Sequence, residues 1–176
     1  MNEKELLWLD VWEDFLKNVN LKSKLPGHPI WADSFVGKET LPGDLHQYTK
    51  KELIAIGKEW SSYGWVKPIK TSMRKAEIIK AIGLPAWKQD FIRKNRHLYA
   101  NNKDFIDTWL EKWNVLGFTE EGERTLPVSR TKYEWQAGPV SRTNWENLIQ
   151  FRPSGIRVKR PNYFPALVAI AQIPMV

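Results

Sequence analysis

The chain has 176 residues, of which 42% are hydrophobic, and it carries 27 Lys and Arg against 20 Asp and Glu. This length suits one domain with a buried core, and the absence of cysteine excludes disulfides, thiolate metal sites and a cysteine nucleophile. The apolar stretches are too short for a membrane span, and the acidic start is unlike a signal peptide, so we expect a cytoplasmic protein.

The first part of the chain, residues 1–117, is predicted to be mostly helical and rich in tryptophan. Trp8, Trp12 and Phe15 fall on one stripe of a helical pattern. Thr49 followed by Glu52 forms a capping box, which indicates a helix start. Helices are expected over residues 5–19, 49–59, 72–82, 85–99 and 101–113, with Trp87, Phe91 and Leu98 buried in the fourth. The stretch "KLPGHPIWADSF" has two prolines and a glycine, which predict an ordered loop or turn.

The second part, residues 118–176, is predicted to be rich in β-structure. Ile156 and Val158 alternate with Arg157 and Lys159, so a strand there would have one apolar face and one basic face. Gly155 is the expected turn before it, Thr143 and Glu146 suit the cap of a short helix, and residues 163–173 are typical of a buried strand. We therefore expect one α+β domain over residues 1–176, with a tryptophan-rich helical part packed on a small irregular sheet.

Positive charge is concentrated in two blocks. Residues 50–100 hold twelve Lys and Arg against four acids, and residues 124–163 hold eight against two. An acidic stretch, residues 101–123, separates them. Clustered charge of this kind is typical of a protein that binds a polyanion, and the alternative is the solvated surface of a basic protein.

Several stretches resemble a known family. "SRTKYEWQAG" and "IQFRPSGIRVKRPNYFPALVAIAQ" are similar to the target-recognition region of bacterial DNA cytosine-5 methyltransferases, and "KLPGHPIWADSF" and "PAWKQDFIRKNRHLY" resemble earlier pieces of that region. The resemblance implies a small domain that lies in the major groove and reads bases. In that family a large domain flips the cytosine out and methylates it from S-adenosylmethionine, within restriction–modification systems.

The catalytic motifs of that family are missing from this chain. It lacks the Pro-Cys nucleophile, the Gly-x-Gly turn that holds S-adenosylmethionine, and the Glu-Asn-Val and Gln-x-Arg-x-Arg motifs. The resemblance therefore implies a recognition module that is a fragment, a split subunit or a free-standing relative. We expect S-adenosylmethionine only in a missing catalytic domain, and no catalytic residue and no cofactor in this chain.

Side chains suited to reading double-stranded DNA gather in the C-terminal part. Arg can donate two hydrogen bonds to a guanine edge, Gln can pair with adenine in the same way, and Lys and Arg also bind phosphates. Ser154 and Gly155 would let the backbone approach DNA closely, and Tyr163 can stack or wedge. The candidate DNA-binding residues are Arg130, Lys132, Gln136, Arg142, Gln150, Arg152, Ser154, Gly155, Arg157, Lys159, Arg160 and Tyr163.

Other interpretations stay open at this point. Arg157 and Lys159 could form only a solvated strand face. The chain could be the recognition part of a restriction nuclease, a module that binds an acidic protein, or a recognition domain that binds DNA too weakly alone. The three histidines lack metal-ligand spacing, so we expect no metal site. A methyltransferase catalytic domain or subunit is the expected protein partner, and no membrane is expected.

Overall fold

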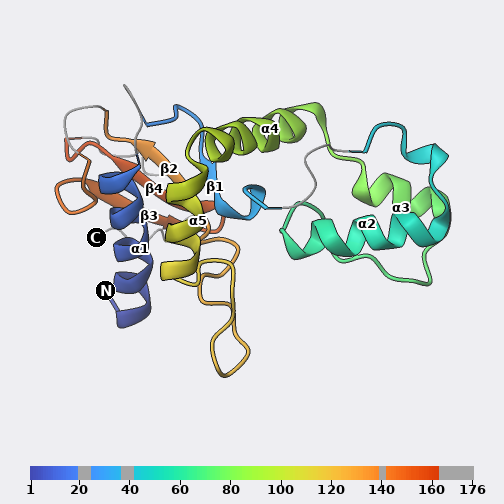
Figure 1. Cartoon of the computed structure of the whole chain (residues 1–176), viewed down its shortest axis with the longest axis horizontal. Coiled ribbons are helices and arrows are strands. Elements are labelled where there is room, and N and C mark those ends of the chain that lie inside the picture. The colour runs from blue at the N-terminus through green and yellow to red at the C-terminus, as the bar shows by residue number, and fades with distance from the viewer. Residues whose placement is uncertain (20–24, 37–41, 139–141, 163–176) are drawn as a thin grey trace, which may run out of the picture. The chain divides into compact units, whose positions relative to one another are not determined.

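The architecture combines helices with one small sheet. The computed structural model describes residues 1–19, 25–36, 42–138 and 142–162, and the elements found there confirm the expected α+β class (Figure 1). The chain divides into two compact units, which we describe separately. Unit 1 comprises Met1–Ala32 and Leu98–Val176, and unit 2 comprises Asp33–His97. The expectation of one domain over the whole chain stays a prediction.

Unit 1 contains a four-stranded sheet with the strand order β1-β2-β4-β3. The strands are β1 (Ile30–Trp31), β2 (Lys132–Gln136), β3 (Leu148–Arg152) and β4 (Gly155–Lys159). β2 runs antiparallel to β1 and parallel to β4, and β3 and β4 form an antiparallel hairpin. The short strand β1 lies inside the stretch expected to be a loop or turn. It forms because β2, far along the chain, supplies its hydrogen-bond partners, which the local sequence does not reveal.

Helix α1 (Glu3–Asn18) lies beside the apolar face of this sheet. It begins two residues before the predicted start because Asn2 and Glu5 form a capping box. The Trp12 ring stacks on Tyr133 of β2 at 4.7 Å between centroids. Helix α5 (Lys103–Lys112) completes this core, since the Trp109 ring lies 5.2 Å from the Trp12 ring. Trp12 and Trp109 are thus core residues that hold the sheet from one side.

Unit 2 is built around the pair of helices α2 (Lys50–Ser62) and α3 (Lys75–Ile82). The predicted capping box of Thr49 and Glu52 is confirmed at the start of α2. At Gly57 an added Cβ would lie 2.5 Å from Ile69 and 3.2 Å from Ile82, so only glycine permits this close approach. Two short 3₁₀ segments precede α2 in the chain: η1 (Ala32–Ser34), which begins at the last residue of the first segment of unit 1, and η2 (Leu45–Gln47). The local signals therefore fix these helices, and apolar packing fixes how they pair.

Two helical predictions need correction. Helix α3 begins at Lys75 rather than at residue 72, because the backbone N–H of Arg74 donates to the Glu77 carboxylate at 2.7 Å and sets the helix start there. Helix α4 (Ala86–Asn101) leaves Trp87 70% exposed, so its predicted burial was wrong. The buried positions of α4 are Ile92, Asn95 and Leu98, and this stripe does not pass through position 87.

The segment of residues 143–147 also differs from its prediction. Thr143 and Glu146 do not cap a helix, because residues 143–147 form a turn. The Asn147 side-chain amide donates to the Thr143 carbonyl, and the Trp145 backbone N–H donates to the Thr143 hydroxyl, so these bonds take the place of helical bonds. The strand predicted over residues 163–173 lies outside the described residues. Among the helices that the structure describes, none is long and apolar enough to cross a membrane.

Candidate nucleic-acid interface

The strand register gathers charged and polar side chains on the sheet face opposite α1. Glu134 pairs with Arg157, and Arg157 pairs with Gln150, so the three lie in one row across β2, β4 and β3. Adjacent rows on the same face contain the remaining polar positions, because alternate residues of a strand share a face. We define the polar face as Lys132, Glu134, Gln136, Gln150, Arg152, Arg157 and Lys159. Ile156 and Val158 alternate with them along β4 and are buried on the opposite face, which confirms the predicted alternation in β4.

Glu134 is the centre of the polar face. Its Oε2 atom accepts a hydrogen bond from Arg157 Nε at 2.7 Å and lies 3.6 Å from Arg152 Nη1. Gln136 donates its side-chain amide to the same carboxylate. The Arg157, Arg152 and Glu134 side chains are 26%, 28% and 19% exposed, so these contacts lie in a partly dry environment where charges interact more strongly than in water.

The geometry at Glu134 leaves one edge of Arg157 open. A guanidinium carries five N–H donors in a rigid fork, and Glu134 uses only the Nε donor of Arg157 in the described contacts. Burial, and then the repulsion of Arg157, lower the pKa of Arg152, while Glu134 acts in the opposite direction. One carboxylate thus holds two guanidinium groups in place and leaves a net positive charge on the face.

The other members of the polar face differ in exposure. Lys132 places its ammonium 4.1 Å from the centre of the Trp31 ring, which is a cation–π contact within unit 1. Gln136 is exposed at the end of β2, whereas Gln150 and Lys159 are buried. The structure therefore brings six of the twelve predicted residues onto one face, but only some of them have surface to offer a ligand.

Arg130 lies on the other side of the sheet. Its guanidinium is 5.1 Å from the Trp8 ring centre and 5.3 Å from the Phe151 ring centre. Its Nη1 donates to the Arg152 carbonyl at 2.8 Å, and burial lowers its pKa. These contacts give Arg130 a packing role between α1 and β3, apart from the polar face.

The β3–β4 turn has a structural need for glycine. Gly155 has a φ of 135°, and an added Cβ would lie 2.8 Å from the Lys132 carbonyl oxygen. The glycine thus permits the close pairing of β4 with β2, in addition to any approach to DNA. Ser154 beside it is exposed.

Three predicted residues lie beyond the strands. Arg160 is exposed, and its guanidinium covers Gly138, where a Cβ would lie 2.8 Å from Nη2. Arg142 is half-buried at the start of the 143–147 turn. Tyr163 lies outside the described residues. No finding tests the DNA contacts of any of the twelve residues, so that assignment stays a prediction.

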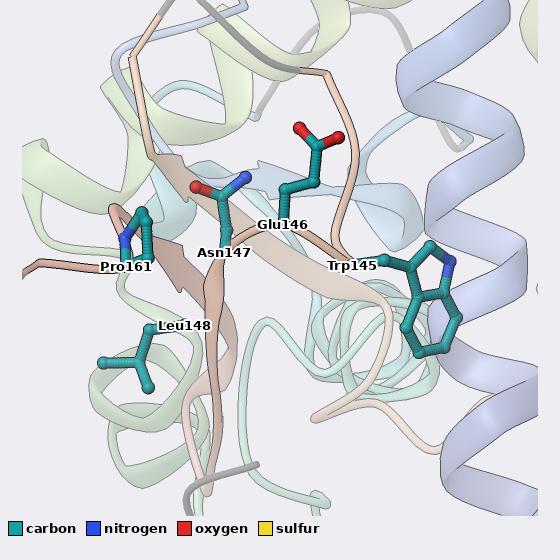
Figure 2. Close-up of a pocket in the computed structure, with 5 residues that line it drawn as sticks. All are labelled: Trp145, Glu146, Asn147, Leu148 and Pro161. Atoms are coloured by element: carbon teal, nitrogen blue, oxygen red, sulfur yellow. The ribbon is translucent and has the colours of Figure 1, made fainter.

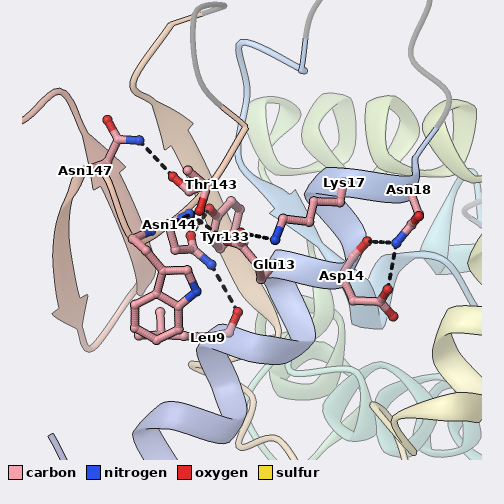
Figure 3. A network of polar contacts seen from close by, with 10 residues as sticks. Leu9, Glu13, Asp14, Lys17, Asn18, Tyr133, Thr143, Asn144 and Asn147 are labelled. Atoms are coloured by element: carbon pink, nitrogen blue, oxygen red, sulfur yellow. Dashed lines mark hydrogen bonds and ion pairs between the residues drawn. The ribbon is translucent and has the colours of Figure 1, made fainter.

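A buried network holds the 143–147 turn on α1 (Figure 3). The fully buried Asn144 donates its backbone N–H to Glu13 at 2.7 Å and its side-chain amide to the Leu9 carbonyl at 3.0 Å. The Tyr133 hydroxyl donates to the Asn144 side chain at 2.6 Å, and burial raises the Tyr133 pKa well above its ordinary value. Sequence reasoning missed Asn144 because its partners come from two distant elements.

The same turn borders an open hollow of about 300 Å³ (Figure 2). Its lining is Trp145, Glu146, Asn147, Leu148 and Pro161. Trp145 is 48% exposed although the turn beneath it is tightly held. The hollow offers an aromatic surface, an amide and one carboxylate. Across the described part of the chain, no three His, Asp or Glu side chains gather in a way that could hold a metal.

Comparison with known proteins relates the chain to a type II methyltransferase. That relative is M.AluI of Cellulosimicrobium cellulans, which is 33% identical over an alignment 184 positions long. The alignment covers all of this chain and 34% of the relative, so the chain spans about a third of its length. No family model matches the chain, and no solved structure matches it. The chain is therefore similar to one region of a methyltransferase of the restriction–modification type.

Proposed function

We propose that the chain is the target-recognition region of a DNA cytosine-5 methyltransferase of a restriction–modification system. In this proposal the polar face and the turns beside it bind double-stranded DNA in the major groove. The observation that carries the proposal is the pair of arginines held on Glu134, in a chain that aligns over its whole length with part of a type II methyltransferase.

Arg157 is the best-placed residue to read a base. Glu134 fixes the Nε atom of Arg157. The terminal Nη edge could therefore bind a ligand with little further loss of side-chain entropy. Such an edge matches the O6 and N7 acceptors of guanine in the major groove. Gln136, exposed on the neighbouring strand, has the donor and acceptor that adenine requires. Arg152, Lys132 and the exposed Arg160 would position the duplex through phosphates.

Methyl transfer belongs to another part of the enzyme in this proposal. Flipping of the cytosine and its attack by a cysteine would come from a catalytic domain or subunit, because this chain has no cysteine. The sequence also lacks the Gly-x-Gly turn at which the resembled family holds S-adenosylmethionine, so the proposal places no cofactor here. This chain would supply the contacts that choose the site.

The test is a selection of double-stranded DNA from a random-sequence pool by the purified chain, at two salt concentrations. We expect a short motif, and we expect Arg157→Ala to lose it, since a bidentate contact discriminates by about 1–3 kcal/mol. Lys94→Ala is the matched control, because Lys94 is a surface cation already paired with Asp90 at 2.8 Å.

The remaining outcomes separate the proposal from its rivals. Binding without a motif in the isolated chain and in the chain supplied with a catalytic partner would contradict a reading role. Cleavage of the pool with magnesium would favour a nuclease. Binding to acidic proteins with no preference among duplexes would favour a protein-interaction module.

A further inference from the structure

The connection between α2 and α3 in unit 2 is a basic surface that the polar face does not include. We define the α2–α3 connection as residues 63–74. Between Glu59 and Glu77 the chain carries four cations and no acid. These cations, Lys67, Lys70, Arg74 and Lys75, are all exposed.

The connection is anchored to the core of unit 2 at several points. Trp65 is 2% exposed, and its backbone N–H donates to the Trp60 carbonyl at 2.9 Å. Lys88 of α4 donates to the Trp65 carbonyl. Ile69 packs against Gly57 of α2. The Met73 N–H closes a turn onto the Lys70 carbonyl at 3.1 Å. The lysines are therefore displayed on an ordered surface.

Two of the four cations make no side-chain hydrogen bond or ion pair with the described residues. Arg74 pairs with Glu77 at 2.9 Å, and Lys75 donates to the His46 carbonyl at 3.1 Å. Lys67 and Lys70, by contrast, make no ion pair with the described residues. Lysines close together in the chain and without an ion-pair partner repel each other, so a bound anion between them would lower this repulsion. The exposed hydroxyl residues Thr71 and Ser72, which follow Lys70, add uncharged donors that suit phosphate oxygens.

The spacing of the two lysines suits a nucleic-acid strand. Three residues of chain span at most about 10 Å. One DNA strand carries a phosphate for about every 3.4 Å of helix axis, so this span matches about three phosphates. A lysine is a compact point charge that binds phosphate without reading bases.

We propose that the α2–α3 connection is a second DNA-binding site, which holds the phosphate backbone of a duplex through Lys67 and Lys70 irrespective of sequence. The choice of duplex DNA as the polyanion rests on the proposed function. The site supplies affinity and leaves discrimination to the polar face of unit 1.

The test compares two double variants of the full chain, each losing two positive charges. Lys67→Ala with Lys70→Ala removes the unpaired cations. Lys4→Ala with Lys94→Ala removes two cations that are already paired with Glu123 and Asp90. Binding is measured by fluorescence anisotropy on several duplexes of unrelated sequence across a salt series, and circular dichroism checks that each variant is folded.

We expect the first variant to weaken binding equally on all duplexes. Each phosphate contact contributes about 0.9 to the slope of log affinity against log salt, so that slope should become shallower by about 1.8. The control variant should change it far less. Equal behaviour of the two variants would overturn the proposal. So would unchanged DNA binding combined with lost binding to vesicles containing phosphatidylserine, or to an acidic protein.

The same data separate this inference from the proposed function. A motif that the Lys67→Ala, Lys70→Ala variant still selects, with uniformly lower affinity, supports both. Weaker binding in that variant, together with no motif from the unaltered chain, supports the backbone site and contradicts the reading role.

Discussion

The polar face in unit 1 and the α2–α3 connection in unit 2 differ in whether their positive side chains are paired with a carboxylate. On the polar face, Glu134 forms ion pairs with Arg152 and Arg157 and orients their guanidinium groups. In the connection, no carboxylate of the described residues pairs with Lys67 or Lys70. A paired guanidinium loses some of its general attraction for anions but gains a defined orientation, whereas an unpaired lysine keeps its attraction and its freedom. If both proposals hold, the difference teaches that selectivity and affinity can be assigned to separate parts of one small chain.

The largest expected effect comes from removing the buried Asn144 network, which supports the sheet that forms the polar face of unit 1. Asn144→Ala deletes the acceptor of the Tyr133 hydroxyl and the donor to the Leu9 carbonyl, and both partners stay buried. We expect the free energy of unfolding to fall by about 3 kcal/mol, measured by urea denaturation. Asn147→Ala, which removes one half-buried bond, is the control and should cost less than 1 kcal/mol, a figure of roughly the size of one net hydrogen bond. Equal losses of unfolding free energy in the two variants would show that the Asn144 network does not stabilise unit 1.

The next effect concerns the strand pairing that builds the polar face. Gly155→Ala places a Cβ at a φ of 135° and 2.8 Å from the Lys132 carbonyl. Strain of this kind should destabilise unit 1 by about 2 kcal/mol, seen as a lower thermal midpoint. Gly27→Ala is a matched control, because no atom lies within 4 Å of its added Cβ. A Gly155→Ala protein as stable as the control would contradict the close β2–β4 approach.

Neutralising Glu134 tests the comparison itself. Glu134→Gln should make the polar face resemble the connection, with more general attraction and less direction. We expect tighter binding to random duplexes, and about a tenfold lower ratio of specific to random binding, within the range of one bidentate base contact. Glu146→Gln removes another acid of the same C-terminal block, and it should leave the ratio unchanged. A ratio unaffected by Glu134→Gln would mean that the carboxylate does not orient Arg157.

The smallest effect is a pH dependence within unit 1. Burial raises the Asp14 pKa, but hydrogen bonds from Lys112 and Trp113 outweigh it and hold the pKa below its ordinary value of 3.8. A depressed carboxyl pKa contributes stability above the unfolded value and loses it as pH falls through the folded value.

Thermal unfolding at pH 6 and at pH 3 checks this dependence. Asp14→Asn should lower stability at pH 6 by less than about 1 kcal/mol and flatten the decline toward pH 3. Asp10→Asn, an exposed change on the same helix, is the control. An unchanged decline in Asp14→Asn would show that another carboxylate is responsible.

The sequence predicts the features that depend on near neighbours. The capping box at Thr49 and the alternation around Ile156 and Val158 are both local patterns, and both are confirmed. The α+β class follows from the same kind of signal. The resemblance to cytosine-5 methyltransferases also points to the relation that the M.AluI comparison supports.

Features that depend on pairing across the sheet could not be predicted in the same way. The central place of Glu134 arises only when β2 and β4 pair in parallel register, and the packing of Arg130 between Trp8 and Phe151 requires α1 to lie against β3. Trp87 was misjudged because the helical stripe of α4 is set by its contacts rather than by its aromatic residues. Long-range geometry thus decides which charges are available.

The pairing of β1 with β2 has a consequence for the order of folding. Ile30 pairs with Tyr133, so all of unit 2 lies in the chain between these two strands. The core of unit 2 is complete as soon as residues 33–97 have been synthesised. The sheet of unit 1 must wait until β4 has left the ribosome, and it must close a long loop whose entropic cost grows only slowly with length. A folded unit 2 would shorten that loop by fixing its middle, so the inserted helices can act as a spacer that speeds the pairing of β1 with β2.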